Sequence, residues 1–83
     1  MNWKKFIFKM TGMVHKAKVR FEESFVDCVF APDIYCAEQL MFRKFENHAM
    51  CDGWEWVNIF RSIGKAVNSE RDVEEFLSKW ENH

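Results

Sequence analysis

KFIFKMTGMVHKAKVRF, residues 5–21, decides the fold, because the stretch fits both a helix and a pair of strands. With helical spacing, one apolar stripe contains Trp3, Phe6, Ile7, Met10, Val14 and Ala17. The helix would carry Gly12 in its interior, at a cost of about 1 kcal/mol relative to Ala, and would leave Phe8 and Val19 on its polar side. The pattern therefore favours two strands with alternating apolar residues.

The predicted turn between these strands is Thr11–Gly12. This turn places Met10 opposite Met13, Phe8 opposite His15 and Phe6 opposite Ala17. Both strands then present their apolar side chains on the same face, an agreement that neither strand enforces alone. We therefore expect an N-terminal hairpin that turns at Thr11–Gly12.

Two further strands and two helices are predicted along the rest of the chain. Alternation at Val26, Cys28 and Phe30 indicates a third strand or a continuation of the second. Pro32 and Asp33 favour a helix over residues 33–49, with an apolar side formed by Ile34, Ala37, Leu40, Met41, Phe45 and Ala49. Aromatic and β-branched residues predict a strand over at least residues 54–61, although the spacing of Trp56, Val57, Phe60, Ile63 and Gly64 also suits a helix.

The last predicted element is an acidic amphipathic helix over residues 69–82. Ser69 and Asp72 have the spacing of a capping box. The apolar positions Val73, Phe76, Leu77 and Trp80 follow with helical spacing. Glu70, Glu74 and Glu75 are predicted to lie on its outer surface.

These elements predict one α+β domain spanning residues 1–83, with a small antiparallel sheet of three to four strands and two helices packed on one face. An all-α small bundle is the alternative. The three Cys cannot all pair within one chain, and no apolar run approaches the ~20 residues that cross a bilayer. We expect a cytoplasmic protein, in the host cytosol if it is viral, with no membrane contact.

The sequence contains no pattern typical of catalysis or of metal binding. Cys28, Cys36, His48 and Cys51 are the candidate metal ligands, but in a helix Cys36 and His48 would lie about 18 Å apart, too far to share an ion. No nucleophile motif or glycine-rich phosphate loop is present. We expect no enzyme activity, no metal and no cofactor.

Charge is distributed unevenly, although the net charge is only -1. Residues 1–20 contain six Lys and Arg and no Asp or Glu, whereas all thirteen acids lie in residues 21–83. In the expected hairpin, one face combines Trp3 with Lys5, Lys9, Lys16, Lys18 and Arg20. In the simplest interpretation, this basic face is only solvated. In the two functional interpretations, it binds either an acidic protein surface or the phosphates of a nucleic acid.

We expect a non-catalytic protein-docking module whose basic face and acidic helix surface orient it on a partner, or on a second copy in a homodimer. In size and composition the chain resembles small accessory proteins of bacteriophages and mobile elements that bind and inhibit host or defence proteins. The alternative is a single-stranded RNA- or DNA-binding protein that uses Trp3, Lys5, Lys16, Lys18 and Arg20.

Overall fold

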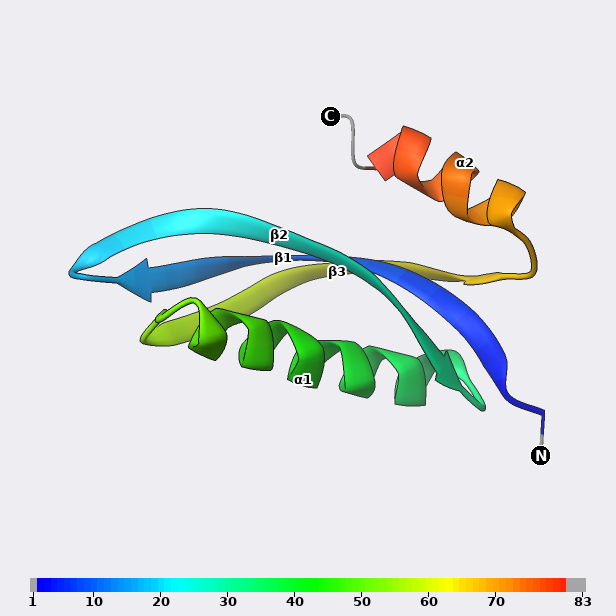
Figure 1. Cartoon of the computed structure of the whole chain (residues 1–83), viewed down its shortest axis with the longest axis horizontal. Coiled ribbons are helices and arrows are strands. Elements are labelled where there is room, and N and C mark those ends of the chain that lie inside the picture. The colour runs from blue at the N-terminus through cyan, green and yellow to red at the C-terminus, as the bar shows by residue number, and fades with distance from the viewer. Residues whose placement is uncertain (1, 81–83) are drawn as a thin grey trace.

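The computed structural model describes residues 2–80 of the chain. Five elements follow one another: β1 (Lys4–Lys16), β2 (Val19–Ala31), α1 (Ile34–Cys51), β3 (Trp56–Val67) and α2 (Glu70–Trp80). The strands form one antiparallel sheet in the order β2-β1-β3. This architecture (Figure 1) confirms the predicted α+β class and rules out the all-helical alternative.

The predicted turn at Thr11–Gly12 is wrong, because β1 runs straight through these residues and turns at Ala17–Lys18 instead. Ala17 and Lys18 adopt positive φ angles of 51° and 68°, the left-handed conformation that two-residue hairpin loops require. The observed register places three apolar pairs on the face toward α1: Phe6 with Val29, Met10 with Phe25, and Val14 with Phe21. Burying these pairs outweighs the cost of the unfavourable turn residues.

Gly12 serves a close approach between strands. A Cβ atom on Gly12 would lie 2.7 Å from the carbonyl oxygen of Asn58 in β3. The register between β1 and β3 shifts at this point, so that Phe60 has no partner on β1. Thr11, which precedes Gly12 in β1, is 5% exposed, and its hydroxyl lies 3.2 Å from the hydroxyl of Ser24 in β2. Thr11 and Gly12 therefore suit the central strand β1, because Thr11 contacts β2 and Gly12 allows the close approach of β3.

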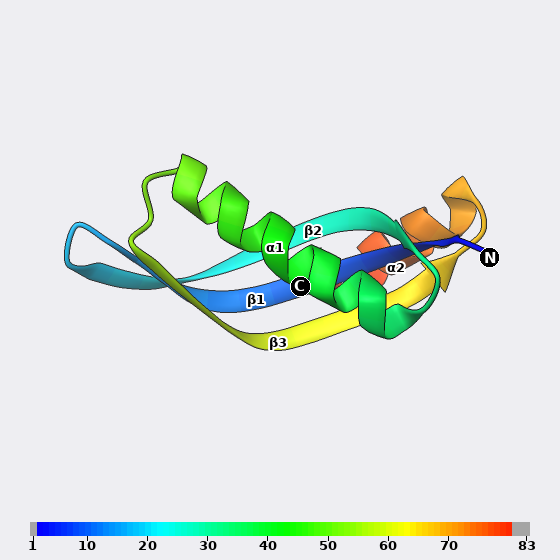
Figure 2. The same cartoon turned by 90° about the horizontal axis from the view of Figure 1, so that it is seen from below.

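The two helices cover opposite faces of the sheet, which corrects the prediction that both pack on one face (Figure 1). Helix α1 buries Ala37, Met41, Phe45 and Ala49, and it lies across the three strands in Figure 2. Its partners on β1 are Phe6, Phe8, Met10 and Val14. On the other face, Phe76 of α2 packs with Ile7 and Val67. Alternate residues of β1 are thus buried under different helices.

The remaining predictions differ from the structure mainly in their boundaries. Strand β3 begins at Trp56, two residues after the predicted start, and extends to Val67, past the predicted minimum of residues 54–61. Helix α2 begins after Ser69, whose hydroxyl accepts a hydrogen bond from the Asp72 N–H at 3.3 Å, as the capping pattern predicts. The predicted end of this helix at residue 82 lies outside the described residues. Between residues 2 and 80, no helix has the length and apolar character needed to span a bilayer.

Replacing Ala17–Lys18 by Asn-Gly should raise the free energy of unfolding by about 1 kcal/mol, since Asn and Gly tolerate positive φ.

Gly12→Ala should lower the free energy of unfolding by about 1–3 kcal/mol, because the new methyl group meets the backbone of β3. Chemical denaturation followed by circular dichroism measures both changes.

The matched control is Thr11→Asn, which would strengthen a turn at Thr11–Gly12. In the observed fold this change disrupts a buried hydroxyl contact, so it should destabilise the protein. Stabilisation by Thr11→Asn, together with no gain from Asn-Gly at positions 17 and 18, would contradict the observed hairpin.

Candidate functional site

The structure does not form the predicted basic face. Lys5 pairs with Phe30 near one end of the sheet, and Trp3 precedes it, whereas Lys16 and Lys18 flank the turn at the other end. Lys16 lies eleven positions after Lys5 along the extended strand, a distance of roughly 36 Å. Arg20 belongs to the turn end, where it pairs with His15.

Lys9 lies between these ends and is tied to α2. Its ammonium group donates a hydrogen bond to the carbonyl of Trp80, in the last turn of that helix, where the helix dipole favours a cation. On the outer surface of α2, Glu70, Glu74 and Glu75 are exposed, as predicted, and Arg71 contacts Glu75 at 3.4 Å. The acidic row therefore faces solvent rather than the lysines of β1.

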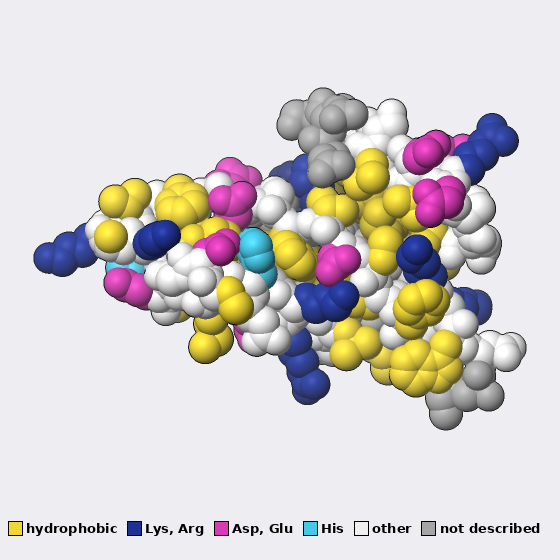
Figure 3. All heavy atoms as spheres, in the orientation of Figure 1, with side chains coloured by type: hydrophobic (Ala, Val, Ile, Leu, Met, Phe, Trp, Pro, Cys, Tyr) yellow, Lys and Arg dark blue, Asp and Glu magenta, His cyan; other side chains and the backbone are white. Residues whose placement is uncertain are grey.

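A different surface stands out, where β2 ends and α1 begins. Large apolar side chains gather there (Figure 3), although an exposed apolar cluster on a small domain is costly unless something binds it. We call it the Phe30 surface, and its members are Trp3 (59% exposed), Phe30 (60%), Ile34 (40%), Tyr35 (80%) and Leu40 (37%). They belong to the start of the chain, the end of β2 and the first half of α1.

A groove of about 490 Å³ runs between β2 and α1 next to this surface. Phe30 and Leu40 supply apolar walls, and Cys28 and the cations Arg43 and Lys44 also line the groove. The Asp27 carboxylate binds Lys44 at 3.1 Å. Within residues 2–80, no ion pair involves Arg43 or Lys5, so these two side chains leave the surface with free positive charge.

The groove does not have the chemistry of an activated thiol or a metal centre. Burial raises the pKa of the Cys28 thiol, and the nearby Lys5 and Lys44 only partly oppose that shift. A thiol with a raised pKa is a poor nucleophile at neutral pH. Among the described residues, no three Cys, His, Asp or Glu side chains come close enough to bind a metal ion.

Sequence reasoning reached only part of this surface. Trp3 and Lys5 were predicted to bind a partner and lie at or beside it. Tyr35 and Arg43 were missed, although both fall outside the apolar stripe predicted for the helix. An aromatic residue outside that stripe was the available signal, because the helix cannot bury it against the sheet.

Comparison of the chain with models of protein families, with curated proteins and with solved structures gives no match. The function is therefore argued from the geometry alone.

The N-terminal cap of α1 precedes Tyr35 and Leu40 in the helix that forms one side of the groove. The stability that this cap contributes should depend on pH. The Cys36 backbone N–H, which donates to the Asp33 carboxylate at 2.9 Å, lowers the pKa of Asp33. A lowered folded pKa stabilises the protein above the unfolded value of about 3.9, and this contribution is lost as the pH falls through the folded value. Asp33→Ala should therefore lower the melting temperature at neutral pH.

The difference from the wild type should shrink when melting is measured in acid. Asp33→Asn is the control, because Asn caps helices without titrating and should retain most of the stability at both pH values. An equal loss for Asp33→Ala at neutral and acid pH would contradict this account of the cap.

Proposed function

We propose that the chain is a non-catalytic protein-docking module whose partner binds the Phe30 surface. The observation that carries the proposal is the gathering of five large, exposed apolar side chains beside the groove between β2 and α1. Apolar patches rimmed by polar groups are typical of protein-binding sites, and aromatic anchors supply much of the affinity there.

The charges beside this surface indicate the chemistry of the partner. Lys5 lies opposite Phe30 on the neighbouring strand, and Arg43 lines the groove. A partner segment that combines aromatic or aliphatic side chains with Asp or Glu would bury its apolar groups and pair its carboxylates with these cations. Inhibition of a host or defence protein stays a proposal of the same class, because blocking a protein needs a docking surface and no active site.

Selection from a random peptide display library against the wild-type protein tests this function. We expect enriched peptides to combine apolar residues with Asp or Glu. Phe30→Ser and Arg43→Glu should each weaken their binding about tenfold or more, since a charge-assisted contact contributes roughly 1.5–3 kcal/mol. Fluorescence polarisation with the enriched peptides measures the change.

Phe60→Ser is the matched control, because Phe60 is similarly exposed at 52% but lies on β3. Its peptide binding should equal that of the wild type. The proposal fails if no peptide is enriched, or if the enriched peptides bind Phe30→Ser and Arg43→Glu as well as the wild type.

One observation favours single-stranded nucleic acid as a second candidate ligand, at the opposite end of the sheet. His15, Arg20 and Trp56 line a hollow of about 230 Å³ near the turn that carries Lys16 and Lys18. The indole suits stacking of a base and the cations suit phosphates. Lys16, Lys18 and Arg20 of the predicted nucleic-acid set lie at this end of the sheet, whereas Trp3 and Lys5 lie at the other end of β1.

Titration with a labelled single-stranded oligonucleotide at low and raised salt tests this candidate. Binding should weaken with salt, because phosphate contacts release counterions, and Arg20→Ala should weaken it further. Arg43→Ala is the control from the other surface and should have no effect. Absence of binding at low salt would eliminate the nucleic-acid function.

A further inference from the structure

The two edges of the sheet differ in how their backbones are covered. At Cys28 in β2, the backbone N–H donates to the Asp27 carboxylate at 2.7 Å, and the carbonyl accepts from the Lys44 ammonium at 3.1 Å. Strand β2 also carries Glu22 and Glu23. Side-chain capping and charge are common ways to stop an edge strand from pairing with another chain. The β2 edge is therefore closed at Cys28.

Among the described residues, the β3 edge has no side-chain cap and fewer charges close to its first half. Strand β3 pairs only with β1, and no hydrogen bond between described side chains and the β3 backbone caps its outer side. Its twelve residues include no Asp or Glu, and its only charges are Arg61 and Lys65. An uncovered edge of this kind presents backbone donors and acceptors to an added strand.

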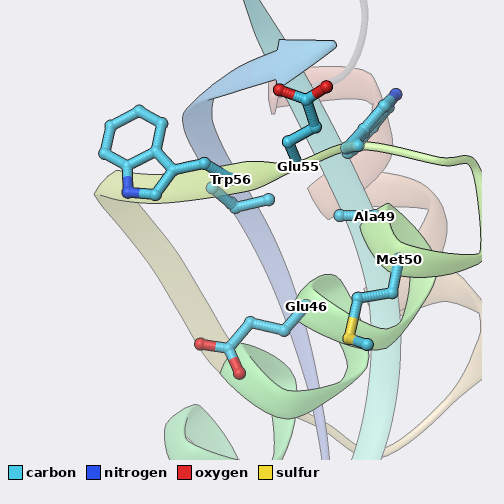
Figure 4. A pocket seen from close by; sticks show the side chains of 7 residues that line it. Glu46, Ala49, Met50, Glu55 and Trp56 are labelled. Carbon is cyan, nitrogen blue, oxygen red and sulfur yellow. The ribbon is translucent and has the colours of Figure 1, made fainter.

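Exposed apolar side chains accompany the open edge. Trp56 is 48% exposed and Phe60 is 52% exposed. Met50, at the end of α1, is 73% exposed. It lines a second hollow of about 230 Å³ together with Trp56, Glu46 and Glu55 (Figure 4). The edge thus combines backbone hydrogen-bonding groups with apolar area on one accessible strip.

We propose that β3 pairs antiparallel with β3 of a second copy, joining two three-stranded sheets across a two-fold axis. An axis at Asn58 would place Arg61 of each copy opposite Glu55 of the other. The pairing is then self-complementary, because each Arg61 meets a carboxylate of the other copy rather than its own counterpart. This interface uses another edge than the Phe30 surface, and the inference does not depend on the proposed function.

Two features limit the assembly to a small closed dimer. Phe60 is the unpaired bulge residue of β3, and a bulge interrupts regular pairing, so the new ladder is confined to residues 57–59, flanked by the contacts of Arg61 with Glu55. The side-chain caps at Cys28 and the charges of Glu22 and Glu23 oppose pairing of the β2 edge with β3 of another copy, so we expect no continuation into a filament. The short contact should give a dimer that dissociates on dilution.

Analytical ultracentrifugation across a wide range of protein concentration tests the dimer, with circular dichroism to verify that each variant is folded. The wild type should shift from monomer to dimer and no further as concentration rises. Glu55→Arg and Arg61→Glu should each weaken dimerisation at least tenfold, because each places like charges together.

The double variant, with Glu55→Arg and Arg61→Glu, should restore dimerisation. The single variant Glu55→Arg and the double variant both lose the 3.0 Å contact between Glu55 and His15, so the loss of this contact cannot explain a difference between them. Tyr35→Ser, on the Phe30 surface, is the control and should dimerise like the wild type. A wild type that is monomeric at every concentration overturns the proposal, as does growth into larger oligomers. A dimer that Tyr35→Ser abolishes, or that the charge swap fails to restore, also overturns it.

Discussion

The pairing of β1 with β2, along thirteen residues of each strand, is the interaction on which the rest of the molecule depends. It places Phe6, Met10 and Val14 under α1 and turns Ile7 toward α2. A shift of this register by one residue would exchange the two faces of β2 relative to β1. Because each face has its own helix and its own small core, such a shift would disrupt both cores.

The same pairing determines which surfaces remain free. Since β1 is the central strand, β2 and β3 are both edge strands, and the two helices pack on a sheet of only three strands. Helix α1 extends beside β2, where Lys44 reaches its backbone and Phe30 stays exposed. Helix α2 is shorter and covers only the end of the sheet near Ile7 and Val67. The apolar groups that this small domain cannot bury are thereby concentrated at one end of β2 and along β3.

Much of the fold was predictable from the sequence, because its helices and strands have clear periodicity. Ala37, Met41, Phe45 and Ala49 of the predicted stripe are buried, and the cap at Ser69 appears as predicted. Ile34 and Leu40 of the same stripe stay exposed. The hairpin turn was not predictable, since Ala17 and Lys18 carry no local preference for positive φ, and long-range packing imposes it. That error displaced the candidate site: the lysines that a Thr11–Gly12 turn would gather lie instead at the two ends of β1.

Cross-strand contacts in solution test the central claim most directly. In a nuclear Overhauser spectrum of the full chain, the account predicts contacts from Phe6 to Val29, from Met10 to Phe25 and from Val14 to Phe21. Contacts from Met10 to Met13 and from Phe8 to His15, with none between Met10 and Phe25, would place the turn at Thr11–Gly12. Such a spectrum would contradict both the register and the surfaces derived from it.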